Sequence, residues 1–525
     1  MRFKYLGFHL LIALVLTFSI ASCQDDWENH YSAKTTIKSN LNLYKFIQSR
    51  ADLSIFTKML QLTGYDSILS KSQTFTVWAP TDSALAGVNL NDTALVSSIV
   101  KNHITRFSYT TTDVFLTRKV LLMFDNKLLV FQKVGSGYTF GGKPIVKPDL
   151  ATANGIVHIL SQYVPYQMNF WEYISSSGND LDSLRNYIKN LTVSQFDPLS
   201  SFQNGIFVDS IFKKTNFVMD SLAHLNVEDS TYTAILPSNA AWASAYNYIF
   251  PYFKTLDIDG GVSTQIANTQ AHIVQDLFYK GAITLPTNRD SLTSTFSNKF
   301  SNPDQLFASS IVKNFSNGIG YVTSTFNVPP TQSWLKPLLI EAESANFKPT
   351  DLINYSKTIV SSIGTGYNVS GGYYLKADSK TESSISKLSV NFPLPNTLST
   401  KYNIYCVFVP GTILNANDLR PNKVRFYLSY VDATGKQITN AAISSSNTVL
   451  TPTSSAAIFT SLPGVIDKKL VVQNFTFPYS NLLTEKQLLT RVALKVENVA
   501  GVTPIEKINF NRTLLIDCII LEPVQ

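Results

Sequence analysis

The chain has 525 residues, of which 44% are hydrophobic and 15% are charged. At about 150 residues per domain, this length predicts three or four domains, and a charged fraction below the ~25% of ordinary soluble domains excludes a disordered acidic or basic protein. The formal charge of +7 is small for the length and no run of Lys and Arg concentrates it, so we expect no nucleic-acid partner.

The first 22 residues are expected to be a signal peptide that is cut from the mature protein. Arg2 and Lys4 form a basic start, and the apolar run of residues 10–20 is shorter than the ~20 residues that a spanning helix needs. Small residues then precede Cys23. This pattern resembles the bacterial lipobox, in which that Cys is diacylated; the alternative is an ordinary signal peptide with a chance cysteine. Loss of Arg2 and Lys4 would lower the charge to +5.

An acidic stretch (QDDWE) follows Cys23 directly. It resembles the surface-export signal of Bacteroidetes-type lipoproteins, and the alternative is a solvated tether over residues 23–37. The two resemblances together imply an outer-membrane protein, held by acyl chains and exposed at the cell surface.

Residues 38–166 begin with apolar residues at helical spacing and continue with strands. The segment 74–80 (TFTVWAP) predicts a strand stopped by Pro80, and Thr81 is placed to cap a helix that enters at Ala84. We also expect a helix over 93–104, strands at 128–131 and 138–140, and a turn with a buried strand over 154–160.

Two of these segments resemble the signatures of the fasciclin domain of extracellular adhesion proteins. Residues 74–85 (TFTVWAPTDSAL) match the first signature, residues 154–160 (NGIVHIL) match the second, and His103 matches the histidine of the helix between them. The family usually carries a Tyr before that His, where this chain has Asn102. The adhesive role attached to the Tyr-His pair is therefore not implied for this chain.

Residues 167–330 are expected to repeat this plan in divergent form. Residues 231–242 align with the first signature, His272 is expected to correspond to His103, and residues 317–322 align with the turn and strand of the second signature. A tandem of fasciclin-like units is the simplest account of this order.

The pattern of apolar residues changes near residues 327–337. This segment holds three prolines and predicts a semi-rigid linker. Short alternating runs separated by turns then predict a β-sandwich over residues 331–525. Residues 340–343 and 515–521 are similar to the first and last strands of jelly-roll carbohydrate-binding modules, which pair with each other. The predicted fold class is thus α+β, with two fasciclin-like domains followed by an all-β, jelly-roll-like sandwich.

A search for catalytic chemistry gives no convincing set. The sequence has no histidine pair at metal-ligand spacing, no GxSxG elbow and no carboxylate pair suited to glycoside hydrolysis. Residues 137–143 have the spacing of a phosphate-binding loop, but Pro144 stands where Ser or Thr would bind Mg²⁺. Residues 256–260 lack the last acidic ligand of a calcium loop. We therefore expect a protein that is not an enzyme.

Candidate ligand-binding residues lie in the C-terminal region. Sugar rings stack on aromatic faces, and Trp334, Tyr367, Tyr373 and Tyr374 lie near the start of the predicted sandwich. For each of them, packing in a core or linker is the alternative.

The resemblance to jelly-roll modules implies one cofactor, a structural calcium ion near the terminal strands. Glu341, Glu343 and Asp517 are the matching carboxylates, and ordinary surface charge is the alternative. Cys406 and Cys518 lie in apolar strand-like runs, so we expect buried thiols; a disulfide between them stays open if their strands are neighbours.

Two functions remain after these exclusions. The first is a lipid-anchored surface protein that binds a polysaccharide without catalysis, as an accessory of a polysaccharide-uptake system. The second keeps the membrane anchor but makes the chain a fasciclin-type adhesin toward extracellular proteins or host matrix. A hydrolase is a third and weaker class.

Overall fold

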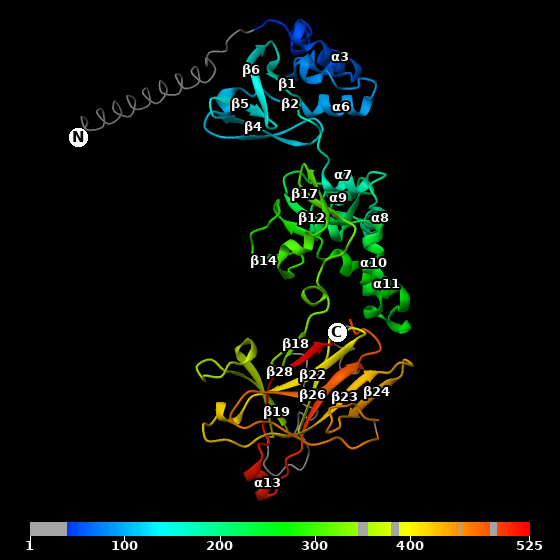
Figure 1. Ribbon diagram of the computed structural model, residues 1–525, viewed down its shortest axis with the longest axis vertical. Coiled ribbons are helices and arrows are strands. Elements are labelled where there is room, and N and C mark those ends of the chain that lie inside the picture. Colours follow the sequence, from blue (N-terminus) through cyan, green and yellow to red (C-terminus); the bar gives the residue numbers. More distant parts are fainter. Residues whose placement is uncertain (1–38, 345–354, 380–387, 452, 483–490, 525) are drawn as a thin grey trace, which may run out of the picture. The chain divides into compact units, whose positions relative to one another are not determined.

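The computed structural model describes residues 39–344, 355–379, 388–451, 453–482 and 491–524 (Figure 1). The chain forms two compact units. The first contains the described residues up to Tyr173 together with Leu225–Thr231 and Asn314–Gly318, and the second contains the rest. The predicted signal peptide, Cys23 and the acidic stretch after it lie outside the described residues. Within the part that is described, no helix is both long and apolar enough to cross a bilayer.

The first unit is built on a seven-stranded sheet of order β2-β1-β7-β6-β5-β4-β3. β1 runs parallel to β7, and the other neighbours are antiparallel. The strands are β1 (Phe75–Pro80), β2 (Ile104–Arg106), β3 (Lys119–Leu122), β4 (Leu128–Val134), β5 (Gly137–Phe140), β6 (Lys143–Thr152) and β7 (Gly155–Leu160). The helices are α2 (Leu43–Gln48), α3 (Ser54–Leu62), α4 (Tyr65–Leu69), α5 (Asp82–Leu85) and α6 (Thr93–Asn102), with short 3₁₀ turns η1 (Ala51–Leu53) and η2 (Thr111–Val114).

Both faces of β1 are buried, because the alternating side chains of a strand enter two different cores. Val77 packs with the helices α2, α3 and α6. Trp78 points to the opposite face, where its ring stacks on Phe140 at a centroid distance of 4.0 Å and on His158 at 5.6 Å. The apolar run of the predicted strand is thus explained by burial on both sides.

The polar residues after β1 hold two helices. Thr81 accepts a hydrogen bond from the backbone N–H of Ala84 and caps α5, as the sequence predicts. Asp82 accepts hydrogen bonds from the backbone N–H groups of Ser54 and Ile55 at 3.1 and 2.7 Å. It therefore caps α3, although the two are far apart in the sequence. Orphan N–H groups at helix starts are satisfied by such oxygens. This motif therefore joins the strand to the helical layer.

Two histidines of the first unit are held neutral by their hydrogen bonds. His103 donates from Nδ1 to the carbonyl of Ile99 (2.7 Å) and accepts at Nε2 from the N–H of Val164 (3.0 Å). His158 accepts at Nδ1 from the N–H of Asp149 and donates to the carbonyl of Tyr109. Each ring has one donor and one acceptor partner, which fixes the neutral tautomer.

The first unit also includes a buried ion cluster around Lys127. Its Nζ lies 2.7 Å from a carboxylate oxygen of Glu172 and 2.7 Å from one of Glu228. The Lys127 side chain is almost fully buried, and removal of one partner from such a cluster leaves a buried charge uncompensated. These contacts tie the turn before β4 to the segments 170–173 and 225–231.

The second unit begins with a helical layer and a four-stranded sheet of order β13-β12-β17-β16. Its helices are α7 (Phe170–Ser175, which starts in the first unit), α8 (Asp182–Asn190), α9 (Pro198–Ser201), α10 (Asn239–Ile249) and α11 (Gly261–Val274), with a π-turn η3 (Val218–Leu222) and 3₁₀ turns η4 (Phe250–Phe253), η5 (Asp257–Asp259), η6 (Pro303–Phe307) and η7 (Pro330–Gln332). Its strands are β8 (Thr192–Phe196), β9 (Phe202–Gln203), β10 (Ile206–Phe207), β11 (Phe212–Asn216), β12 (Tyr232–Pro237), β13 (Phe278–Lys280), β14 (Ser291–Thr293), β15 (Lys299–Ser301), β16 (Ser310–Phe315) and β17 (Gly318–Thr323).

An asparagine clamp recurs in the two predicted repeats. Asn154 accepts from the N–H of Leu43 and donates to the carbonyl of Leu69. Asn317 accepts from the N–H of Phe170 and donates to the carbonyl of Leu225 in the same way. Each clamp fixes the start of a helix to the turn before a central strand.

The strand within the first signature, β1 or β12, carries a threonine at the same position in both repeats. Thr76 donates to the carbonyl of Phe107, and Thr233 donates to the carbonyl of Gly281. Equivalent residues making equivalent hydrogen bonds are what an internal repeat produces.

The predicted correspondence between His272 and His103 is wrong. The backbone N–H of Trp78 donates to the carbonyl of His103. The backbone N–H of the equivalent residue, Ile235, donates to the carbonyl of Leu277. Leu277 therefore occupies the place of His103. His272 lies earlier on α11, where its ring packs on Phe253, because the second repeat carries extra residues between the end of its helix and β13.

The segment predicted to be a linker is packed instead. Ser333 donates to the buried carboxylate of Asp276, and Leu335 is buried. Trp334 lies against Tyr252 at a ring distance of 4.7 Å. The prolines rigidify this segment, but its apolar residues attach it to the second repeat.

The C-terminal region forms two antiparallel sheets around one core (Figure 1). One sheet has the order β19-β20-β28-β22-β26 with β18 also paired to β28, and the other has the order β21-β27-β23-β24 with β25 paired to β23. The strands are β18 (Leu338–Glu341), β19 (Tyr355–Ser361), β20 (Tyr373–Ser379), β21 (Ser389–Pro393), β22 (Lys401–Phe408), β23 (Lys423–Val431), β24 (Gln437–Ala442), β25 (Phe459–Thr460), β26 (Asp467–Thr476), β27 (Ala493–Asn498) and β28 (Leu514–Pro523). Two 3₁₀ turns, η8 (Ser370–Gly372) and η9 (Gly411–Ile413), and helix α13 (Pro504–Asn509) complete it.

We predict that acid destabilises the first unit through His103. Burial lowers the pKa of His103 from 6.5 to about 4. The unfolded chain therefore binds the proton first, so stability is lost as the pH falls from 6.5 toward 4, by up to about 1 kcal/mol per pH unit. Denaturant unfolding at pH 7 and pH 5 should show a smaller loss in His103→Gln than in the unsubstituted chain. The exposed His224 offers the control His224→Gln, which should keep the full loss; equal losses in all three chains would contradict the prediction.

Candidate functional site

The pairing of β18 with β28 places acidic residues from the two ends of the C-terminal region side by side. Glu341 is in register with Cys518, and the N–H of Ala342 donates to the carbonyl of Asp517. On its other side β28 is paired with β22, where the register shifts at Asp517. An extra residue of this kind is a β-bulge, which re-aims side chains. The bulge lets Asp517 and Cys518 both approach Glu341.

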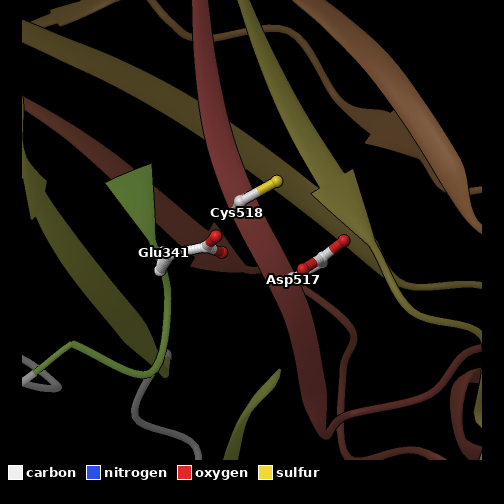
Figure 2. A group of neighbouring side chains, drawn as sticks. All are labelled: Glu341, Asp517 and Cys518. Carbon is white, nitrogen blue, oxygen red and sulfur yellow. The ribbon is translucent and has the colours of Figure 1, made fainter. Parts of the chain in front are cut away.

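Figure 2 shows these three side chains, with Glu341 on the short strand and the other two on β28. One ligand atom from each, a carboxylate oxygen or the sulfur, lies within 4.8 Å of the others. Glu343 lies close enough for its pKa to respond to the charges of Glu341 and Asp517. The structure thus brings together Glu341 and Asp517 of the three predicted carboxylates, with Cys518 in place of Glu343 in the group of neighbouring ligand atoms.

The loop before β20 closes over this acidic cluster. Ser370 donates its N–H to both oxygens of Asp517 (3.1 and 3.2 Å) and its hydroxyl to Glu341 Oε1 (2.6 Å). Gly371 has a φ of +59°, and a Cβ there would lie 3.1 Å from Oε1 of Glu343. Glycine is needed because the backbone turns left-handed against a carboxylate.

Burial first, and then neighbouring negative charge, raise the pKa values of Asp517 and Glu343. The pKa of Asp517 rises to about 6, through burial first and then the charge of Glu341. Burial also raises the pKa of Glu343, with smaller effects from the charges of Glu341 and Asp517. Burial and these same carboxylates raise the pKa of the Cys518 thiol well above its ordinary value. The cluster therefore concentrates negative charge that the described residues neutralise only in part.

Two oxygens in this cluster lack a hydrogen-bond partner among the described residues. Oε2 of Glu341 and Oε2 of Glu343 are both buried and unpaired. Buried polar atoms are normally hydrogen-bonded, so each exception calls for an explanation. Calcium prefers six to eight oxygen ligands, mostly carboxylate and carbonyl, and a protonated thiol is a poor ligand for it. The donor set therefore fits a hard divalent cation.

The four predicted stacking residues differ in exposure. Trp334 is 8% exposed and Tyr374 is 1% exposed, so neither ring face is open to a sugar, and the core-packing alternative holds for both. Tyr374 packs in a small apolar cluster with Val369, Val409 and Leu515. Tyr373 is 44% exposed, because it is the first residue of β20 and points the opposite way.

Tyr367 is half-buried and joins three loops. Its hydroxyl is 2.6 Å from the hydroxyl of Thr412 and 3.4 Å from the carbonyl of Gly464. Tyr367 and Ser370 lie in the loop between β19 and β20, whereas Tyr373 is the first residue of β20 and is in register with Ser361 of β19. The acidic cluster binds Ser370 and so holds the loop that contains Tyr367 and ends directly before Tyr373.

The two cysteines of the sandwich are free and buried. Cys406 is adjacent to Val407, which is in register with Cys518, so the two thiols lie on neighbouring strands but on opposite faces. The open question of a disulfide is thereby answered in favour of two thiols.

Sequence reasoning missed Ser370, Gly371 and the place of Cys518 beside the carboxylates. The glycine pair at 371–372 was a signal for a tight turn, but a turn alone does not show which side chains it faces. Cys518 was expected to be a buried, inert thiol; its place beside Glu341 follows from the register of β18 with β28, and the bulge brings Asp517 to the same group.

Comparison with protein families matches residues 51–164 to the Fasciclin domain. This is a family of non-enzymatic adhesion domains, and the match covers both signatures recognised in the first repeat. No curated protein sequence matches this chain.

Several solved structures are similar to parts of the chain. A FAS1 domain pair from the insect cell adhesion molecule Fasciclin I is 15% identical, covering 54% of this chain and 98% of that one, with a TM-score of 0.21. A Paenibacillus xanthan lyase is 14% identical and covers 49% of this chain and 20% of the lyase (TM-score 0.20). A carbohydrate-binding module described for mannan recognition is 12% identical, covering 36% of this chain and 99% of the module (TM-score 0.20). At these TM-scores the similarities carry no argument about function.

We predict that removing one charge from the cluster stabilises the metal-free protein at neutral pH. The folded-state pKa of Asp517, about 6, lies above its unfolded value of 3.8, so its contribution to stability is present at low pH and is lost as the pH rises through 6. In EDTA at pH 7.5, Asp517→Asn should raise the free energy of unfolding by about 1 to 2 kcal/mol, after allowance for solvent screening. The advantage should vanish near pH 4.

The matched control is Glu522→Gln on the same strand, whose carboxylate is exposed and paired with Lys468. It should leave the stability at pH 7.5 nearly unchanged. A loss of stability in Asp517→Asn at pH 7.5 would show that the carboxylates do not repel one another.

Proposed function

We propose that this chain is a non-catalytic glycan-binding protein, anchored through lipid on Cys23 at the outer membrane and exposed at the cell surface. The observation that carries the binding role is the exposed side chain of Tyr373 at the start of β20, directly after the loop that the acidic cluster holds through Ser370. An aromatic face on a paired strand can stack on a pyranose ring at low cost in conformational entropy.

The anchor and compartment are supported by the lipobox-like sequence before Cys23 and the acidic stretch after it. A surface position would suit capture of a polysaccharide for an uptake system. The fasciclin-type repeats would then serve to hold the binding region away from the membrane.

We further propose that the acidic cluster binds a structural calcium ion. Glu341, Glu343 and Asp517 would supply the oxygens, including the two that are buried without a partner. The ion would replace mutual repulsion by attraction and would fix Ser370 in place. Binding should weaken below pH 6, where Asp517 takes up a proton.

Calcium should therefore raise the melting temperature at pH 7.5. We expect millimolar calcium to stabilise the unsubstituted chain and Glu522→Gln by several degrees over EDTA, since a ligand that binds only the folded state stabilises it. Asp517→Asn should show little response, and all responses should be smaller at pH 5. A calcium shift of equal size in Asp517→Asn would place the ion elsewhere.

The glycan proposal is tested by isothermal titration against a polysaccharide panel. We expect Tyr373→Ala to weaken binding by about tenfold or more, the equivalent of ~1.4 kcal/mol. Ile363→Ala removes an exposed apolar side chain from the same segment and is the matched control, which should bind normally. Failure of the unsubstituted chain to bind any glycan would remove this function.

A second candidate, adhesion to extracellular proteins or host matrix, is favoured by the Fasciclin match. In that domain Phe115 and Leu116 form an exposed apolar pair. Attachment of protein-coated beads that is lost with Phe115→Ser and Leu116→Ser, but kept in Tyr373→Ala, would support adhesion over glycan binding.

A further inference from the structure

The second repeat carries an insertion that its fold does not require. We call residues 192–216 the arm. In the first repeat only two residues, Thr63 and Gly64, separate α3 from α4. In the second repeat the arm lies at the equivalent place, between α8 and η3. The correspondence of α8 with α3 rests on capping: Asn239 accepts from the N–H of Ser183, as Asp82 does from the start of α3.

The backbone of the arm is well ordered by hydrogen bonds. β8 pairs with β11 and β9 pairs with β10, both antiparallel. Between these ribbons the N–H of Asp197 donates to the carbonyl of Ile211, and the N–H of Val208 donates to the carbonyl of Ser201. At the base, Asn216 is buried and donates to the carbonyl of Ile188.

The apolar side chains of this ordered segment are exposed. Leu199 is 91% exposed and Ile206 is 71% exposed. Seven other large apolar residues of the arm are exposed as well: Val193, Phe196, Phe202, Phe207, Val208, Ile211 and Phe212. Contiguous exposed apolar surface marks an interaction site, and an isolated two-stranded ribbon is marginally stable unless another element covers it.

The charges of the arm indicate what covers it. The base of the arm is the end where Thr192 pairs with Asn216, and its tip is the opposite end. Asp197 and Asp209 lie toward the tip, beyond the pair formed by Phe196 and Phe212, whereas Lys213 and Lys214 lie toward the base. Two arms laid antiparallel would bring the acidic tip of each against the basic base of the other. A bilayer is a poor alternative, because two carboxylates among the apolar residues of the tip would enter it at high cost. The hydrogen bonds from Ser200 lower the pKa of Asp197 and keep it ionised.

We propose that the arm binds the arm of a second copy of this chain, antiparallel, in a two-fold symmetric dimer. In each arm the two-stranded sheets have free edges among the described residues, so two ribbons can pair edge to edge. Nine apolar side chains that each offer on the order of 100 Å² give an area comparable with the ~800 Å² per partner of a standard interface.

The test is sedimentation velocity of the chain without its first 22 residues and with Cys23→Ser, so that no acyl chain drives association. We expect a dimer at micromolar concentration. Leu199→Ser with Ile206→Ser should raise the dimer dissociation constant by about tenfold or more, as loss of central apolar contacts does.

Ile505→Ser with Ile508→Ser is the matched control, because it removes two exposed apolar side chains outside the arm. That variant should dimerise normally. Circular dichroism would confirm that both variants are folded.

A charge exchange keeps the proposal testable if the serine variant does not fold. Lys213→Glu with Lys214→Glu should weaken the dimer, and so should Asp209→Lys. Mixing these two variants should restore association, because opposite charges then face each other.

Three outcomes would overturn the proposal: a monomer at every concentration, a dimer that survives both sets of arm substitutions, or an arm that binds anionic lipid vesicles while the free chain is monomeric. Glycan titration of the same variants keeps this result separate from the function proposed for Tyr373.

Discussion

The antiparallel pairing of β18 with β28 is the contact on which the candidate site depends. It joins the first and last strands of the C-terminal region, and it puts Glu341 beside the bulge that holds Asp517. The pairing buries Asp517 and sets it beside Glu341, so burial first, and then the charge of Glu341, raise the pKa of Asp517 to about 6. It also leaves one buried oxygen of Glu341 without a hydrogen-bond partner among the described residues. The site is thus a consequence of sheet topology rather than of any local motif.

A second kind of constraint organises the two repeats, and it is made by short polar side chains. Asn154 and Asn317 each tie a helix start to a turn before a central strand. Asp82 and Asn239 each cap a helix that lies far away in the sequence. Because these contacts satisfy backbone groups that would otherwise be buried without partners, the residues recur even where the surrounding apolar residues differ. The arm can be inserted between them without disturbing either contact.

Much of the fold could be predicted from local patterns, because a buried strand such as 74–80 and a cap such as Thr81 are encoded by neighbouring residues. The carboxylates of the candidate site were predicted only through resemblance, since their proximity arises from strand pairing over a long sequence distance. Trp334 and Tyr374 show the limit of reasoning from residue type: an aromatic ring suits a core as well as a sugar, and only burial distinguishes the two. The prediction that His272 corresponds to His103 was wrong for another reason. Residue type alone suggested the match, whereas the backbone hydrogen bonds to the central strand give Leu277 the place of His103.

The scarcity of charge in this chain makes its buried carboxylates informative. Asp276, in the second repeat, is completely buried, yet its oxygens accept hydrogen bonds from Ser294, Asn298 and Ser333. That carboxylate is structural, because its donors come from the segments that it holds together. Glu341 differs: one oxygen receives the hydroxyl of Ser370 and the other is buried without a donor. One buried carboxylate of this chain is thus fully satisfied by hydrogen bonds, and another is left incomplete beside like charges. This contrast is what supports the proposed cation, which would fix Ser370 and the loop that leads into β20.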